Sequence, residues 1–100
     1  MEHNEEVILL KVCKNINRQY KVNNRIDQLL EAPLSDSEIE YLTLYLLMYR
    51  SLSTLLSDDK QLNLWLRGYN SSLDGYPINL MLSTQGLKQI NQYLEAQVIY

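Results

Sequence analysis

The chain has 100 residues, the length of one ordinary domain, and a formal net charge of −3 at pH 7. Hydrophobic residues make up 46% of it and charged residues 21%, a balance that excludes a disordered or low-complexity chain. Because the net charge is small, we expect neither strong nucleic-acid binding nor membrane attraction from the chain as a whole. The eight Tyr, one Trp and no Phe favour contact with a protein partner, since Tyr tolerates half-buried interface positions.

Two features of the sequence bear on the cellular compartment. Cys13 is the only cysteine, so the chain cannot form an internal disulfide. The amino end has no charged segment followed by an apolar run and a small-residue cleavage site. The longest apolar run is also far too short to span a membrane. We therefore expect a cytoplasmic protein that has no membrane partner.

The first predicted element is an amphipathic helix from about Asn4 to Tyr20. Its apolar positions recur every three or four residues, at Leu9, Cys13, Ile16 and Tyr20. The pair Asn23-Asn24 is expected to interrupt it, because short polar side chains compete for backbone hydrogen bonds. A second helix is then predicted through Leu30.

The same part of the chain carries a basic stripe. No acidic residue lies between Val7 and Ile26. Five basic residues recur there at spacings of three and four: Lys11, Lys14, Arg18, Lys21 and Arg25. Such a stripe can make a weak, salt-sensitive contact with DNA phosphates. The alternative is a solvated polar face that nearby acidic residues partly balance.

A longer helix is predicted next, from about Asp36 to Leu56. Pro33 disfavours helical backbone in the residue before it, and Ser35 followed by Glu38 has the spacing of a capping box. The middle of this helix, from Leu42 to Tyr49, is apolar nearly all the way round. Such a helix needs cover on several sides, and we expect another chain to supply part of it.

A shorter helix is expected after Ser57, which we assign as its cap. Asp58 and Asp59 suit the positive end of its dipole, so helix capping is favoured over a paired acid and base or an ion site. Gly68 is placed to end the helix. Its buried edge is predicted at Leu62, Trp65 and Leu66.

The remaining sequence predicts a loop and two more helices. The loop runs from Gly68 to Tyr76, and Pro77 suits the first position of a short helix through Met81. Ser83 is expected to cap the last helix. The apolar face of that helix recurs at Leu87, Ile90, Leu94 and Val98.

These elements predict an all-α fold, because no strand alternation, hairpin signal or internal repeat is present. We expect a compact bundle of about five helices with a long central helix and a carboxy-terminal helical binding module. Residues 1–34 are assigned to a short basic helical segment and residues 35–100 to the main helical domain.

The sequence lacks the residue sets that enzymes and metal sites need. His3 is the only histidine and Cys13 the only thiol, so neither a nucleophile beside a base nor a zinc site can be assembled. The three glycines are dispersed and form no phosphate-binding loop. For Cys13, a small core residue is favoured over a reactive thiol. We expect no catalysis, no cofactor and no metal.

A longer pattern links the later elements. A long helix leads to a Trp-Leu-Arg step, a loop with Asn, Leu, Gly and Pro, a short apolar helix, a turn with Gly and a final amphipathic helix. Its positions are Trp65, Leu66, Arg67, Asn70, Leu73, Gly75, Pro77, Ile78, Leu80, Met81, Gly86, Leu87, Tyr93 and Leu94. In this order and spacing, residues from about Ser35 to Val98 resemble the carboxy-terminal toxin-binding domain of the Xre/MbcA/ParS antitoxins.

The resemblance implies an antitoxin of a bacterial type II toxin-antitoxin system. Its toxin would be a RES-domain protein, or a related one that transfers ADP-ribose or degrades NAD, neutralised by binding over the active site. The resemblance places the toxin contacts on exposed polar and aromatic groups: Arg67, Asn70, Asp74, Tyr76, Gln97 and Tyr100. Gly75 is expected to permit the backbone turn of the loop, and Tyr69 stands where many relatives have proline.

Two other functions stay open from the residues alone. A DNA-binding transcriptional regulator would use the basic stripe, although about 34 residues before Ser35 are few for the complete helix-turn-helix that such antitoxins usually carry. An orphan scaffold protein would dimerise through a symmetric contact of Leu42 to Tyr49. For the partners, we expect a cognate protein toxin and a homodimer, with weak DNA binding as a minor possibility.

Overall fold

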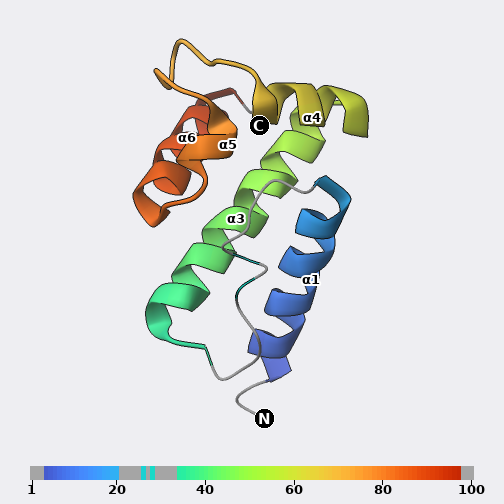
Figure 1. Ribbon diagram of the computed structural model, residues 1–100, viewed down its shortest axis with the longest axis vertical. Helices are drawn as coiled ribbons and strands as arrows, with labels where there is room; N and C mark the ends of the chain where they lie inside the picture. Colours follow the sequence, from blue (N-terminus) through green and yellow to red (C-terminus); the bar gives the residue numbers. More distant parts are fainter. Residues whose placement is uncertain (1–3, 21–25, 27, 29–33, 98–100) are drawn as a thin grey trace.

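The computed structural model describes residues 4–20, 26, 28 and 34–97, and their regular structure is helical (Figure 1). The helices are α1 (Asn4–Tyr20), α3 (Asp36–Leu55), α4 (Asp59–Arg67), α5 (Pro77–Leu80) and α6 (Thr84–Gln97). This confirms the predicted all-α bundle with a long central helix. The predicted helix through Leu30 falls largely outside the described residues. None of the helices in the described part is long and apolar enough to cross a membrane.

The central helix α3 begins at the predicted capping box. The Ser35 hydroxyl accepts from the Glu38 backbone N–H at 3.1 Å, and the Glu38 carboxylate accepts from the Ser35 N–H at 2.8 Å. Two backbone donors that the first helical turn leaves unpaired are thereby satisfied. The local sequence therefore fixes the start of α3, and with it the position of the buried face that follows.

The core lies where α3 runs between α1 and α6 (Figure 1). Its side chains come from all three helices and include Leu10, Cys13, Ile16, Tyr41, Leu42, Tyr45, Met48, Leu52, Leu87, Ile90 and Leu94. We had placed Leu9 on the buried face of α1, but it is only partly buried. The buried face of α1 includes Leu10 and Asn17 instead. The apolar middle of α3 is thus covered largely by its own domain, while Leu47 stays 46% exposed.

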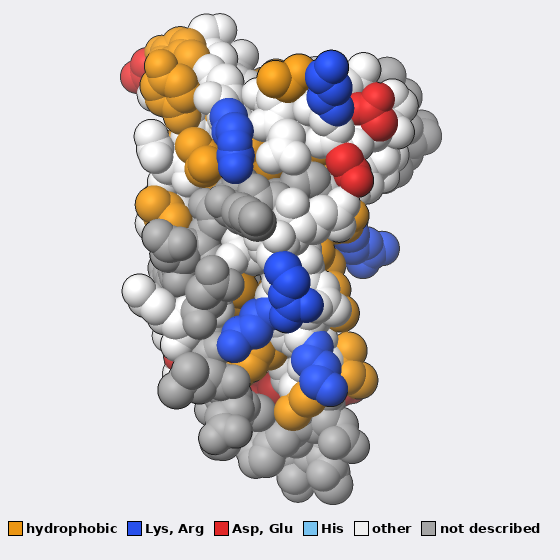
Figure 2. Space-filling view, turned by 45° about the vertical axis from the view of Figure 1, so that its right-hand side comes forward, with side chains coloured by type: hydrophobic (Ala, Val, Ile, Leu, Met, Phe, Trp, Pro, Cys, Tyr) orange, Lys and Arg blue, Asp and Glu red, His pale blue; other side chains and the backbone are white. Residues whose placement is uncertain are grey.

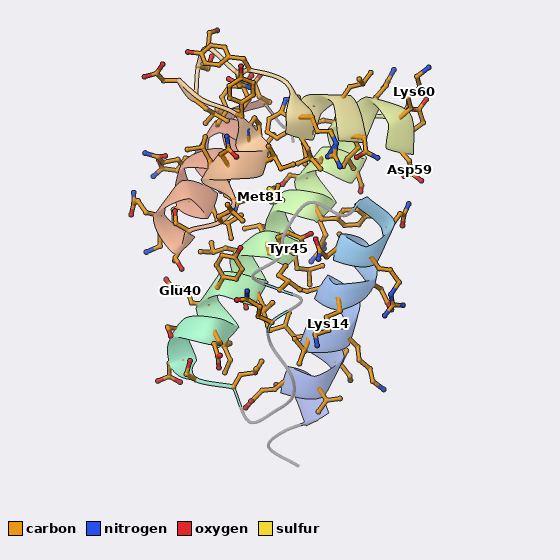
Figure 3. All side chains as sticks on the ribbon, in the orientation of Figure 1. Lys14, Glu40, Tyr45, Asp59, Lys60 and Met81 are labelled. Atoms are coloured by element: carbon orange, nitrogen blue, oxygen red, sulfur yellow. The ribbon has the colours of Figure 1, made fainter. Side chains whose placement is uncertain are left out.

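Polar contacts join α1 to the rest of the fold. The Leu34 N–H donates to the Glu6 carboxylate at 2.7 Å, and the Gln19 amide donates to the Asp59 carboxylate at 2.7 Å. Figure 3 shows Asp59 in the first turn of α4, near the end of α1. Residues of α1 also belong to the same hydrophobic core as the other helices. The predicted division of the chain between residues 34 and 35 stays a prediction.

The cap of α4 differs from the one we predicted. Asp58, not Ser57, is the N-cap, and its carboxylate accepts from the Gln61 N–H at 2.8 Å. Ser57 instead donates from its hydroxyl to the Gln61 side chain at 3.1 Å. Both Ser and Asp cap helices well. Asp58 is the cap because it has extended backbone and stands three residues before Gln61, whose N–H it accepts.

A glycine permits the close approach of α5 and α6. The Gly86 N–H donates to the Ser83 hydroxyl at 2.9 Å, as expected for a cap at Ser83. A Cβ on Gly86 would overlap the carbonyl oxygen of Leu80 at the end of α5. The corner between the two helices therefore has no room for any side chain at this position.

Candidate functional site

The connection from α4 to α5 is a tightly bonded loop. The Asn70 N–H donates to the Gly75 carbonyl at 2.8 Å, and the Gly75 N–H donates back to the Asn70 carbonyl at 3.2 Å. Inside this bridge, the Asn70 side chain accepts from the Leu73 N–H at 3.0 Å. The loop's own hydrogen bonds, including the one that the Asn70 side chain accepts, therefore hold its shape.

The backbone turn is made by a different residue from the one we expected. Asp74 has φ 54°, while Gly75, to which we had assigned the turn, has no positive φ. Asp tolerates the left-handed region better than most side chains because its short polar group can bond locally. Gly75 instead exchanges two backbone hydrogen bonds with Asn70.

Two tyrosines stand on the outside of this loop. The Tyr69 hydroxyl donates to the Asp74 carboxylate at 2.8 Å. The rings of Tyr69 and Tyr76 meet edge to face with centroids 5.5 Å apart, and they remain 56% and 46% exposed. The hydrogen bond to Asp74 raises the pKa of Tyr69, because ionisation would place two negative charges side by side. The loop thus presents an oriented aromatic pair to solvent.

The predicted contact residues fall into three places. Asn70, Asp74 and Tyr76 lie in the loop, and Arg67 lies just before it as the last residue of α4. Gln97 lies at the end of α6, apart from this group. Tyr100 is outside the described residues. Sequence reasoning did not select Tyr69 as a contact, since only the folded loop brings it against Tyr76 and Asp74.

An apolar groove is lined by residues from the end of α3, from α4 and from the end of α6. The rings of Trp65 and Tyr93 stack with centroids 6.5 Å apart and an angle of 23°. They border a groove of about 200 Å³ whose other lining residues are Leu52, Leu55, Leu56, Leu94 and Gln97. Trp65 is half-buried, so it contributes both to the predicted buried edge of α4 and to the wall of this groove.

The structure describes only part of the predicted basic stripe. Lys11, Lys14 and Arg18 lie on α1 at spacings that place them along one side of the helix, while Lys21 and Arg25 are outside the described residues. Arg18 donates to the Asn15 side chain at 3.1 Å, and Lys14 is half-buried. Figure 2, which turns this side forward, shows Lys and Arg side chains with hydrophobic ones beside them.

Cys13 is a core residue, as predicted. It is fully buried, its thiol lies 3.5 Å from the Leu42 carbonyl, and burial raises its pKa to about 12. A thiol that remains protonated and covered is a poor nucleophile. Within residues 4–20, 26, 28 and 34–97 there is also no group of three or more His, Cys, Asp or Glu that could hold a metal ion.

Comparison with known proteins adds one finding to this geometry. Residues 51–97 match the family model described as the antitoxin Xre/MbcA/ParS C-terminal toxin-binding domain. No curated protein and no solved structure shows a significant match. The matched segment starts within α3, later than the resemblance we drew from Ser35, and it contains both the loop and the apolar groove. Over residues 51–97, this chain is therefore similar to the toxin-binding domain of the Xre/MbcA/ParS antitoxins.

Proposed function

We propose that this protein is the antitoxin of a type II toxin-antitoxin pair and that the loop from Gly68 to Tyr76 is its main toxin contact. The toxin we propose is RES-like, an enzyme that transfers ADP-ribose or degrades NAD. The antitoxin acts in the cytoplasm without a cofactor and without catalysis of its own. Its loop and the end of α6 lie over the mouth of the toxin's active site, so that substrate is excluded.

The exposed pair Tyr69 and Tyr76 is the observation that carries this proposal. Tyrosines supply large contact areas at protein interfaces for a small loss of side-chain entropy. Here Tyr69 is already held by Asp74 and by the ring of Tyr76. A contact surface that is ordered before binding avoids part of the entropic cost of association.

The loop geometry divides the proposed contact residues by role. Asn70 and Asp74 use side-chain oxygens to hold the loop, so their contribution to binding is chiefly the placement of neighbouring groups. Tyr76 and Tyr69 offer exposed rings to the toxin. Arg67 offers a positive charge to an acidic group on the toxin, and Gln97 and Tyr100 extend the contact from the end of the chain.

Co-expression with the product of the adjacent gene tests the proposal. The wild-type chain is expected to restore growth of cells that produce the toxin and to co-purify with it. The double variant Tyr69→Ala/Tyr76→Ala should fail in both assays. Ile8→Ala is the matched control, because Ile8 is 61% exposed on α1, outside the matched segment. Absence of any complex between the wild-type chain and a RES-like neighbour would reject the proposed toxin class.

DNA binding through α1 is the second candidate, favoured by the alignment of Lys11, Lys14 and Arg18 along one side of that helix. Phosphate contacts release counterions, so affinity for the upstream DNA should fall steeply with salt concentration. Replacing these three residues by Ala should flatten that dependence. Binding that is independent of salt, or no binding at all, would remove this candidate.

A further inference from the structure

The outer face of α1 carries apolar side chains that the fold does not use. Ile8 is 61% exposed, and Val7 and Val12 are each 37% exposed. Ile8 and Val12 stand four residues apart, so one lies above the other on the helix. The opposite face of α1 supplies its side chains to the core: Leu10, Cys13 and Ile16. This helix therefore has one apolar strip toward the core and a second one toward solvent.

Helix formation does not explain the outer strip. β-Branched side chains lose rotamer freedom in a helix, and Lys, Glu, Gln or Ala would form an exposed turn more readily. A single exposed aliphatic side chain is ordinary on a protein surface. Here three of them, Val7, Ile8 and Val12, fall within two turns of one helix. Neighbouring exposed apolar groups of this kind mark a contact surface.

Charged side chains border the outer strip in a definite order. At about 100° of rotation per residue, Lys11 lies on one side of Ile8 and Glu5 lies on the other. Arg18 continues the basic side two turns beyond Lys11. All three charged side chains are exposed, and Lys11 has no ion-pair partner among the residues that the structure describes. Figure 2 shows hydrophobic side chains beside Lys and Arg on this side of the molecule.

Hydrogen bonds near both ends of α1 hold this face in place. Near its start, the Glu6 carboxylate accepts from the Leu34 N–H at 2.7 Å. Near its end, the Gln19 amide donates to the Asp59 carboxylate of α4 at 2.7 Å. The outer strip is thus part of a helix that is fixed before any partner arrives, which lowers the entropic cost of binding.

The order of charges distinguishes between possible partners. DNA phosphates and anionic lipid headgroups both present an array of negative charge, which Glu5 would repel beside the apolar strip. Helices that lie on lipid surfaces also carry larger apolar groups, such as Trp, Phe and Leu. A protein helix can instead set aliphatic side chains on Ile8 and Val12 and carboxylates on one flank alone. That flank is the side of Lys11 and Arg18.

We propose that the outer face of α1 docks an acidic amphipathic helix of a second protein other than the toxin. The partner's apolar side chains pack on Ile8 and Val12, and its carboxylates pair with Lys11 and Arg18. The contact does not rest on the proposed function, because α1 lies outside the segment that matches the toxin-binding family. It also differs from the phosphate contact considered above, which needs the cations but not the apolar strip.

Selection from a displayed library of helical peptides, each as long as the 17 residues of α1, tests the proposal with the full chain as bait. Enriched peptides should carry apolar residues at helical spacing with Asp or Glu along one flank. The best of them, made synthetically, should bind Ile8→Gln/Val12→Gln at least about 30-fold more weakly than the wild type. Far-UV circular dichroism should show unchanged helix content, since both replaced side chains face solvent.

Two further variants separate the charges from the general effect of a surface substitution. Lys11→Glu/Arg18→Glu should weaken binding of the same peptide about tenfold, because like charges then face one another. Leu64→Gln is the matched control, since Leu64 is 65% exposed on α4, and it should bind as the wild type does.

The rival partners are tested with the same variants. A selection that enriches no peptide, or only peptides without acidic residues, would overturn the proposal, as would equal affinity for wild type and Ile8→Gln/Val12→Gln. Duplex DNA or phosphatidylglycerol vesicles that bind the wild type but not this double variant would assign the face to that ligand instead. Loss of toxin binding in the double variant would make the toxin the partner of α1 and would also reject the proposal.

Discussion

The core between α3 and α6 and the loop from Gly68 to Tyr76 lie close together in this protein, yet they are held by different forces. Ile90, Leu94 and Leu52 are almost completely buried, so the free energy that holds the helices together comes mainly from apolar surface removed from water. In the loop, Tyr69 and Tyr76 are exposed, and hydrogen bonds between neighbouring residues hold the shape. Because scaffold and proposed contact are separate, mutations should affect stability and binding independently.

The largest effect is expected at the corner of α5 and α6. Gly86→Ala should lower the free energy of unfolding by about 3 kcal/mol, because the new methyl group meets the fixed Leu80 carbonyl and the helices must move apart. Denaturant unfolding measures the change. Gly75→Ala is the matched control, since its Cβ would meet Leu80 side-chain atoms at an ordinary 3.6 Å and should change stability little. Equal losses for the two variants would contradict this account of the corner.

The next effect separates binding from stability. Tyr76→Ala should weaken toxin binding by about 2 kcal/mol, which is roughly 30-fold in Kd, because a preorganised aromatic side chain at the centre of an interface is a typical hot spot. Its free energy of unfolding should be nearly unchanged, since the ring is 46% exposed. Calorimetric titration with the toxin and denaturant unfolding give the two values. A Tyr76→Ala variant that is much less stable but binds the toxin as the wild type does would contradict the separation of scaffold and contact.

A pH titration of stability tests the core through Cys13. Its pKa is raised by burial from 9.0 to about 12, so the unfolded chain loses the thiol proton first as pH rises. Stability from this group is therefore complete below about pH 9 and should fall by about 1 kcal/mol over the next pH unit. The comparison is with Cys13→Ala, which should lack this part of the slope. Parallel pH curves for the two proteins would show that the thiol does not titrate in this way.

The smallest effects concern the brace within the loop. Asp74→Ala should weaken toxin binding several-fold, because it removes the acceptor for Tyr69 and puts a less tolerant residue at φ 54°. Asp74→Asn should bind nearly as the wild type does, since it keeps both properties. Absorbance titration adds a readout without toxin, in which the pKa of Tyr69 should move back toward its ordinary value in Asp74→Ala. An unchanged Tyr69 titration would mean that the brace is not formed in solution.

The elements that the sequence predicted well depend on local contacts. The Ser35–Glu38 capping box, Pro77 at the start of α5 and the helical repeat of Leu87, Ile90 and Leu94 each involve residues within one or two turns. Such patterns constrain the backbone whatever surrounds them. The all-α bundle and the likeness to the antitoxin domain follow from these patterns.

The features that the sequence did not predict depend on choices between similar residues or on packing. Ser57 and Asp58 are both good caps, and Asp74 and Gly75 can both take a left-handed turn, so only the folded chain decides between them. The edge contact of Tyr69 with Tyr76 needs the bridge of Asn70 and Gly75 to fold the loop back. No pattern of polarity marks that contact in advance.

The most direct test of the proposed role of the loop is calorimetric titration of the toxin into the wild type, Tyr69→Ala/Tyr76→Ala and Ile8→Ala. We predict that the double variant binds at least about 100-fold more weakly than the wild type, while its free energy of unfolding and the affinity of Ile8→Ala stay unchanged. Wild-type affinity in the double variant would contradict the claim that this loop is the toxin contact.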